Sequence, residues 1–102
     1  MATSEAFTKA AIDSTKLTVK PNSDQLLDLY ALYKIATGEN IAEAPEPGRF
    51  DFKGNSKRKA WKAKVDTGIT REKAEADYIA LVEKFKVDYK YDPNKVSESF
   101  GG

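Results

Sequence analysis

The spacing of apolar residues in the last third of the chain is the feature that most constrains the fold. From Ala74 to Tyr89 these residues recur mostly every three or four positions, which places them on one face of an α-helix. They are Ala74, Tyr78, Leu81, Val82, Phe85 and Tyr89. No segment shows a sustained alternation of apolar and polar residues, the pattern of a half-buried strand. The sequence therefore predicts an all-α fold.

Capping and breaking residues divide the chain into four expected helices. They run from Thr3 to Leu17, from a cap at Asn22 or Ser23 to a stop near Gly38, from a cap at Asn55 or Ser56 through Val65, and from a cap at Thr70 to Asp92. The connection from Gly38 to Gly54 has two prolines and no sustained period. Connections of this length are uncommon in compact domains and are usually functional or disordered, so we expect a site nearby.

Cysteine and histidine are both absent from the 102 residues. Their absence excludes disulfides, Cys/His zinc sites, thiol nucleophiles and every Ser-His or Cys-His catalytic pair. What remains possible is catalysis by lysine, acidic, tyrosine or hydroxyl side chains, or binding alone. No carboxylate or lysine stands out as a general base, so no catalytic or metal-ligating residue is assigned. Hydrophobic residues make up 40% of the chain, charged residues 32%, and the mean hydropathy is −0.61. These values are typical of a single soluble domain.

Two further patterns bear on location. No apolar run approaches the ~20 residues that cross a bilayer. The first residues, Met1 to Phe7, lack the basic and apolar regions of a secretory signal. The expected location is cytoplasmic.

A local run of positive charge contrasts with a net charge of only +1. Six lysines and arginines lie between Lys53 and Lys64, with no acid between Asp51 and Asp66. Such a run is usually a solvated helix face, and the functional alternative is a phosphate-bearing ligand. The expected cap puts Lys57 in the first helical turn, where free N–H groups favour anions. The neighbouring aromatic residues are interpreted as core: Phe50, Phe52 and Trp61.

The second expected helix is apolar on more than one face, because Leu29, Leu32 and Ile35 extend the surface begun by Leu26 and Leu27. It is either a central helix packed on two sides or a helix with one stripe facing the core and another facing an apolar ligand or partner.

Two tyrosines add polar groups to these apolar faces. Tyr30 and Lys34 are four residues apart, so a phenol and an ammonium lie side by side, which suits a phosphate next to a ring. Tyr78 lies on the core face of the last helix, where its hydroxyl needs a phosphate or a backbone carbonyl as partner.

Several motifs together resemble the signature of the acyl-CoA-binding protein family. They are FTKAA at Phe7 to Ala11, KP at Lys20-Pro21, YALYK at Tyr30 to Lys34, FDFKGNSKRKAW at Phe50 to Trp61, and the last helix around Tyr78. The resemblance covers nearly everything from Phe7 to Tyr89. It implies a four-helix, up-down-down-up bundle over residues 3–92, followed by a short flexible tail, residues 93–102. It also implies high-affinity binding of long-chain fatty acyl-CoA esters by an intracellular carrier and buffer that performs no catalysis.

The resemblance assigns roles to particular residues. Tyr30, Lys34 and Lys57 would hold the 3′-phosphate of CoA, Tyr33 would stack near the adenine, Lys53 and Tyr78 would add contacts, and Leu26 and Leu27 would wall the acyl-chain groove. It implies no cofactor, a monomer, no nucleic acid, and transient contact with acyl-CoA-using enzymes and membranes. The alternative from the residues alone is a small helical module that binds nucleic acid or a phosphoprotein through Lys53 to Lys64.

Some positions depart from the family pattern. A first-helix lysine of the family is matched by Thr15, with Lys16 next to it. Arg58 stands where a tryptophan is common. Leu32 and Ile35 replace more polar residues and are interpreted as a partner surface.

Overall fold

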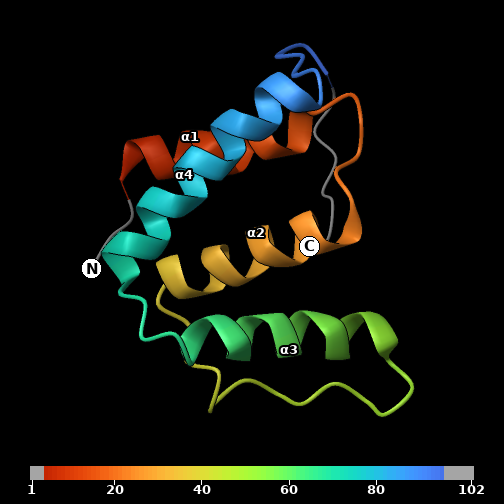
Figure 1. The fold of residues 1–102 in the computed structure, drawn as a ribbon, viewed down its shortest axis with the longest axis vertical. Helices are drawn as coiled ribbons and strands as arrows, with labels where there is room; N and C mark the ends of the chain where they lie inside the picture. Colours follow the sequence, from red (N-terminus) through yellow and green to blue (C-terminus); the bar gives the residue numbers. More distant parts are fainter. Residues whose placement is uncertain (1–3, 96–102) are drawn as a thin grey trace.

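The computed structural model describes residues 4–95, which form four α-helices (Figure 1). The elements are α1 (Glu5–Asp13), the 3₁₀ turn η1 (Ser14–Lys16), α2 (Ser23–Ala36), α3 (Phe52–Val65) and α4 (Arg71–Asp88). Extended pairing within the described residues is limited to one isolated bridge, between Leu17 and Tyr91. The predicted all-α fold is confirmed.

The helices lie in an up-down-down-up order, as predicted. In Figure 1, α2 and α3 run in the same direction, and α1 and α4 run in the opposite one. α2 packs against both α3 and α4, and α1 packs against α4. Among the described helices, α3 packs against α2 alone. α2 is therefore the central helix, which accounts for its apolar character on more than one face.

The core lies on both sides of α2. Its buried apolar residues are Phe7, Ala10, Leu17, Leu29, Leu32, Ile35, Ala36, Trp61, Ala74, Tyr78, Val82 and Phe85. Leu32 and Ile35 are only 3% and 8% exposed, so their interpretation as a partner surface is wrong. The reason is the central place of α2, because a helix covered from two sides buries apolar residues on both.

The ends of α2, α3 and α4 follow local capping chemistry. Asn22 and Gln25 form a capping box at the start of α2. The Thr70 side chain accepts a hydrogen bond from the Lys73 N–H at the start of α4. Gly38 and Gly68, after α2 and α3, have φ of +79° and +78°, the left-handed conformation that glycine adopts at helix ends.

The start of α3 differs from the expected one. The cap is Asp51, whose carboxylate accepts a hydrogen bond from the Gly54 N–H at 2.9 Å, and the helix begins at Phe52. A Cβ at residue 54 would collide with that carboxylate, so a side chain there would displace the cap. Asn55 is helical and donates to the carbonyls of Gly48 and Asp51. Lys57 consequently lies in the second turn of α3, and the expectation that it shares the helix terminus is wrong.

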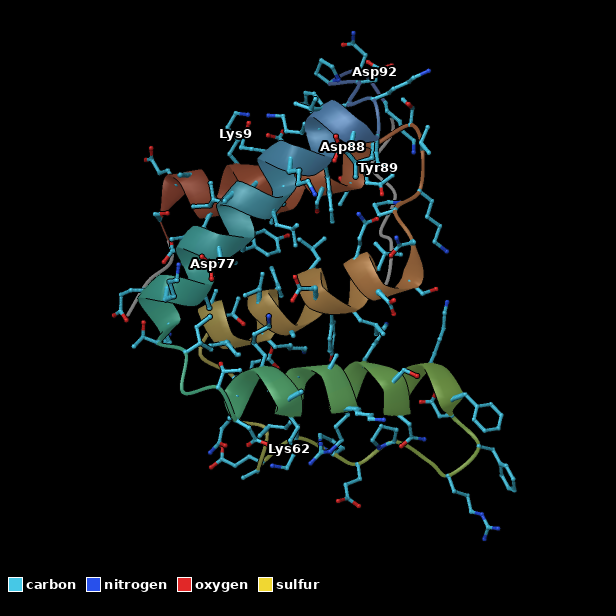
Figure 2. All side chains as sticks on the ribbon, in the orientation of Figure 1. Lys9, Lys62, Asp77, Asp88, Tyr89 and Asp92 are labelled. Carbon is cyan, nitrogen blue, oxygen red and sulfur yellow. The ribbon has the colours of Figure 1, made fainter. Side chains whose placement is uncertain are left out.

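The outer helices are shorter than expected at their carboxyl ends. α1 ends at Asp13, because the 3₁₀ turn replaces its last expected turn. α4 ends at Asp88, and Lys90 adopts a φ of +52° that turns the chain back. The returning segment pairs with the connection between α1 and α2: Thr18 N–H donates to Lys90 C=O at 3.1 Å, and Asp92 N–H donates to Lys16 C=O at 3.0 Å. Figure 2 shows Tyr89 and Asp92 beside that connection. Residues 96–102 of the expected tail lie outside the described residues.

A buried carboxylate joins the first helix, the last helix and the returning segment. Asp13 is 4% exposed and accepts hydrogen bonds from Lys9 at 2.7 Å, Lys86 at 3.0 Å and the Tyr91 hydroxyl at 2.9 Å. Burial acts to raise the pKa of Asp13, but these three donors outweigh it, and the pKa is lowered.

We expect Asp13→Asn to lower the free energy of unfolding at pH 7 by about 2 kcal/mol, because hydrogen bonds to a charged acceptor are lost. A lowered carboxyl pKa stabilises the fold above the ordinary aspartate pKa, and this stabilisation is lost as the pH falls through the folded-state value. Urea unfolding at pH 7 and at stepwise lower pH should therefore show the two proteins converging in acid. The exposed Asp66→Asn is the matched control. An Asp13→Asn loss that stays constant down to the acid limit would contradict this assignment.

Candidate functional site

A cavity of about 290 Å³, the amino-end groove, opens where the amino ends of α2 and α3 lie side by side. Its lining residues are Lys20, Ser23, Leu26, Leu27, Phe52, Lys53, Ser56 and Lys57. The structure thus brings together four residues singled out from the sequence: Leu26, Leu27, Lys53 and Lys57. They meet because α2 and α3 run parallel, which places their first turns at the same end.

A tyrosine with two ammonium groups near its ring adjoins this groove. The Lys34 Nζ lies 5.5 Å and the Lys57 Nζ 5.4 Å from the centre of the Tyr30 ring, both within cation–π range. We call Tyr30, Lys34 and Lys57 the Tyr30 cluster. Because Lys57 also lines the amino-end groove, a positively charged site and an apolar site share a side chain.

Lys34 is held in place by its neighbours. Its Nζ lies 2.9 Å and 3.1 Å from the two carboxylate oxygens of Glu39, and 5.6 Å from the Trp61 ring. The hydrogen bond to Glu39 raises the pKa of Lys34 above its ordinary value, against the opposing effect of partial burial. The ammonium is therefore charged at neutral pH and points along one defined direction.

Tyr33 and Tyr78 belong to a separate cluster of three rings. The ring centres of Phe7, Tyr33 and Tyr78 lie 4.8 to 5.7 Å apart. Tyr33 remains 39% exposed, whereas Tyr78 is 3% exposed. Burial raises the pKa of Tyr78, and a hydrogen bond with Ser14 opposes this effect. The hydroxyl of Tyr78 therefore has a side-chain partner inside the protein, which neither sequence interpretation had named.

The six cations between Lys53 and Lys64 do not form one surface. Lys53 and Lys57 line the groove, while Lys62 pairs with Asp66 at 3.1 Å on the side of α3 away from α2 (Figure 2). Lys64 reaches Asp28 on α2 at 2.7 Å. Arg58 instead holds the long connection, donating to the carbonyls of Ile41 and Ala44 at 3.2 Å each and of Pro45 at 3.4 Å. These cations therefore contact different parts of the protein.

The aromatic residues around this segment differ in burial. Trp61 is 3% exposed, as predicted for a core residue. Phe50 and Phe52 are 76% and 75% exposed, so their interpretation as core residues is wrong. The reason is their position: Phe50 precedes the Asp51 cap and Phe52 is the first residue of α3.

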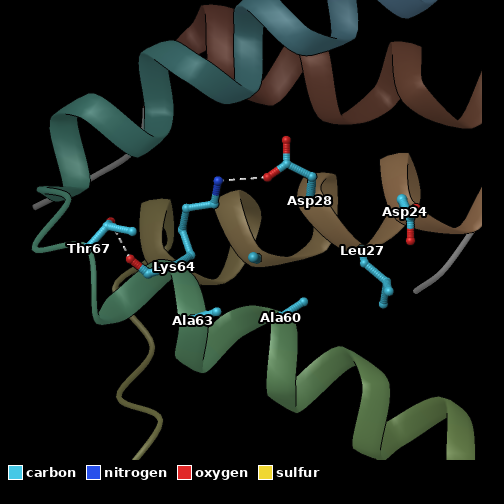
Figure 3. A pocket seen from close by; sticks show the side chains of 8 residues that line it. Asp24, Leu27, Asp28, Ala60, Ala63, Lys64 and Thr67 are labelled. Atoms are coloured by element: carbon cyan, nitrogen blue, oxygen red, sulfur yellow. Dashed lines mark hydrogen bonds and ion pairs between the residues drawn. The ribbon is translucent and has the colours of Figure 1, made fainter.

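A second cavity of about 400 Å³, the alanine cavity, lies further along α2 and α3 (Figure 3). It is lined by Asp24, Leu27, Asp28, Ala31, Ala60, Ala63, Lys64 and Thr67. Leu27 lines both cavities. The ion pair between Asp28 and Lys64 lies at the alanine cavity in Figure 3. Sequence reasoning missed this cavity, although the small residues on facing helix turns are its signal.

Two structural features are absent from the described residues. Residues 4–95 contain no group of three or more acidic side chains placed to hold a metal ion. Over the same residues, no helix combines the length and apolar character needed to cross a bilayer.

Comparisons with known proteins converge on one family. The family model described as "Acyl CoA binding protein" matches residues 4–82. The chain is 42% identical over 87 residues to the acyl-CoA-binding protein of Saccharomyces cerevisiae, covering 84% of this chain and 95% of that protein. It is 40% identical over 85 residues to acyl-CoA-binding protein homolog 1 of Caenorhabditis elegans, covering 82% and 94% of the two chains.

A solved structure agrees with the sequence comparisons. The crystal structure of acyl-CoA-binding protein 2 of Oryza sativa superimposes with a TM-score of 0.70 at 34% identity, covering 82% of this chain and 90% of that one. The resemblance first visible in the motifs around Tyr30 and Trp61 thus extends over most of the sequence and over the fold. The chain belongs to the acyl-CoA-binding protein family.

Proposed function

We propose that this protein binds long-chain fatty acyl-CoA esters and serves as a carrier and buffer of the acyl-CoA pool. The observation that carries the proposal is the contact between the Tyr30 cluster and the amino-end groove through Lys57. An acyl-CoA has a charged nucleotide and a long apolar chain in one molecule. A cationic, aromatic site next to an apolar groove matches both parts. Family membership supports the same function, and no observation favours the nucleic-acid or phosphoprotein alternative.

The Tyr30 cluster is the proposed site of the 3′-phosphate. The ammonium groups of Lys34 and Lys57 both lie close to the Tyr30 ring, so a phosphate can accept charge-assisted hydrogen bonds from them while the Tyr30 phenol lies beside it. Tyr33 offers the adenine an exposed ring that rests on Phe7 and Tyr78. Tyr78 thus contributes by fixing the Tyr33 ring, and Lys53 adds positive charge at the groove.

The acyl chain is proposed to lie in the amino-end groove against Leu26 and Leu27. Each buried methylene contributes up to ~0.8 kcal/mol, so a sixteen-carbon chain offers on the order of 10 kcal/mol if fully covered. Nanomolar affinity, about −12 kcal/mol, is then reachable after the entropy cost of association, with help from the charged head group. Burial supplies most of the affinity in this account, and charge supplies the orientation.

Binding without catalysis completes the proposal. The residues that line the groove are lysines, serines, leucines and a phenylalanine, so the lining itself contributes no carboxylate as a general base. We propose residues 3–92 as the binding domain of a cytoplasmic monomer that takes no cofactor and delivers its ligand to acyl-CoA-using enzymes and membranes.

Isothermal titration with hexadecanoyl-CoA, octanoyl-CoA and free CoA at physiological salt tests this function. We expect one-to-one binding that is tightest for hexadecanoyl-CoA and weakens as the chain shortens, because methylene burial is lost. The hexadecanoyl ester must be kept below its micelle concentration. Absence of binding to all three compounds would overturn the proposal, and binding to DNA that collapses with salt would favour the alternative.

A further inference from the structure

The end of α2 turns an acidic side chain back onto a member of the Tyr30 cluster. Gly38 has a left-handed φ of +79°, and its N–H donates to the Ile35 C=O at 3.0 Å. The Glu39 N–H then donates to the Lys34 C=O at 3.1 Å. These two hydrogen bonds form the Schellman motif that ends many helices at a glycine. The motif fixes the backbone of Glu39 beside Lys34, whose Nζ lies 2.9 Å and 3.1 Å from the two carboxylate oxygens.

The chain is also held on both sides of Glu39 by arginines from other helices. Before it, Arg71 of α4 donates to the Ala36 C=O at 3.4 Å. After it, Arg58 of α3 donates to the Ile41 C=O at 3.2 Å. The carboxylate of Glu39 is therefore presented to Lys34 by a fixed backbone, and the ion pair follows from the fold.

The same ammonium is the proposed donor to the 3′-phosphate, so two anions compete for it. A lysine ammonium has three N–H donors, and both carboxylate oxygens of Glu39 already lie within hydrogen-bond distance of it. A phosphate oxygen that bonds to Lys34 would lie next to that carboxylate, and like charges at such a distance repel. The Glu39 side chain is 46% exposed, so it can turn into solvent when a phosphate takes its place.

We propose that Glu39 competes within the protein for Lys34 against the 3′-phosphate and thereby limits how tightly the nucleotide is held. The carboxylate neutralises and orients the ammonium, the phosphate replaces the carboxylate on binding, and the carboxylate takes the ammonium back on release. A carrier gains from this exchange, because the departing phosphate leaves no unpaired cation behind. The inference rests on the proposed function, since it takes the phosphate at the Tyr30 cluster as given.

Titration of Glu39→Gln with hexadecanoyl-CoA and with hexadecanoyl-3′-dephospho-CoA tests the competition. The amide keeps an acceptor oxygen for Lys34 but removes the negative charge. An ion pair with this exposure changes an equilibrium constant by up to about fivefold, so we expect Glu39→Gln to bind hexadecanoyl-CoA roughly threefold to fivefold more tightly. The analogue without the 3′-phosphate leaves the ion pair intact, and its affinity should stay unchanged.

Asp66→Asn is the matched control. Asp66 also pairs with a helical lysine, Lys62, at 3.1 Å, but on the side of α3 away from α2. Its replacement changes the net charge by the same amount and should leave the affinities for both ligands unchanged at physiological salt.

Each outcome decides the proposal. Equal or weaker binding of hexadecanoyl-CoA by Glu39→Gln overturns it and makes Glu39 a positioning residue for Lys34. The same gain on both ligands, or the same gain in Asp66→Asn, also overturns it, because the effect is then one of net charge. Absence of hexadecanoyl-CoA binding by the unchanged protein overturns the proposed function itself. Equal binding of both ligands by the unchanged protein overturns the phosphate site and leaves acyl-CoA binding in place.

Discussion

Lys34→Ala is expected to weaken the binding of hexadecanoyl-CoA, octanoyl-CoA and free CoA by the same factor, roughly tenfold to hundredfold. The reason is that a charge-assisted hydrogen bond contributes about 1.5–3 kcal/mol. All three ligands share the 3′-phosphate that the Tyr30 cluster is proposed to hold. The structure favours a large effect, since Lys34 is fixed between Glu39 and the rings of Tyr30 and Trp61. A positioned cation loses little rotamer freedom when the phosphate arrives.

The matched control for this prediction is Lys62→Ala. Lys62 is also a helical lysine paired with an acid, but it lies on the side of α3 away from α2. Its removal lowers the net charge by the same amount and should leave all three affinities within about twofold at physiological salt. Thermal unfolding of both variants shows whether the loss of the Glu39 pair affects the fold. A Lys34→Ala loss that grows with acyl-chain length would argue against a phosphate role.

The parts of the fold that local chemistry determines were predictable from the sequence. The Thr70 cap and the glycines after α2 and α3 lie where the sequence indicated, because caps and left-handed glycines act within one helical turn. The central role of α2 was one of two interpretations of its apolar residues. Choosing between them needed the packing of α3 and α4 on its two sides.

The start of α3 was not predictable in the same way. Asn55 and Asp51 are both good capping residues, and the choice of Asp51 depends on Gly54 leaving room for its carboxylate. Because α3 begins one turn earlier than expected, the interpretation of Phe50 and Phe52 also changed. Hydrophobic type alone indicated burial, but the two rings lie at the start of α3 and are largely exposed.

The candidate site was also predictable only in part. Tyr30 and Lys34 were predictable as neighbours, because residues four apart share a helix face. Lys57 joins them only because α2 and α3 run parallel. Arg58 donates hydrogen bonds to carbonyls of the connection between α2 and α3, and a run of positive charge did not predict them. The alanine cavity was missed because alanines in a helix also reflect ordinary helix propensity.

Leu27→Asp is expected to produce a loss that depends on acyl-chain length. Leu27 lines both the amino-end groove and the alanine cavity, so a chain that follows the seam between α2 and α3 must pass it. A hydrated carboxylate at this position removes apolar contact from each methylene that reaches it. At ~0.8 kcal/mol per methylene, the loss of three or four methylene contacts lowers the affinity for hexadecanoyl-CoA by roughly a hundredfold. Octanoyl-CoA should lose much less, and free CoA should bind as before.

Val87→Asp is the matched control, because it introduces the same carboxylate on the exposed face of α4. It should leave the affinities for all three ligands unchanged. Circular dichroism and thermal unfolding of Leu27→Asp show whether the helices remain intact, since Leu27 is half-buried between α2 and α3. If the fold is intact and free CoA loses as much affinity as hexadecanoyl-CoA, the chain does not pass Leu27. A loss confined to long chains instead separates the two halves of the site, because Lys34→Ala and Leu27→Asp then act on different parts of one ligand.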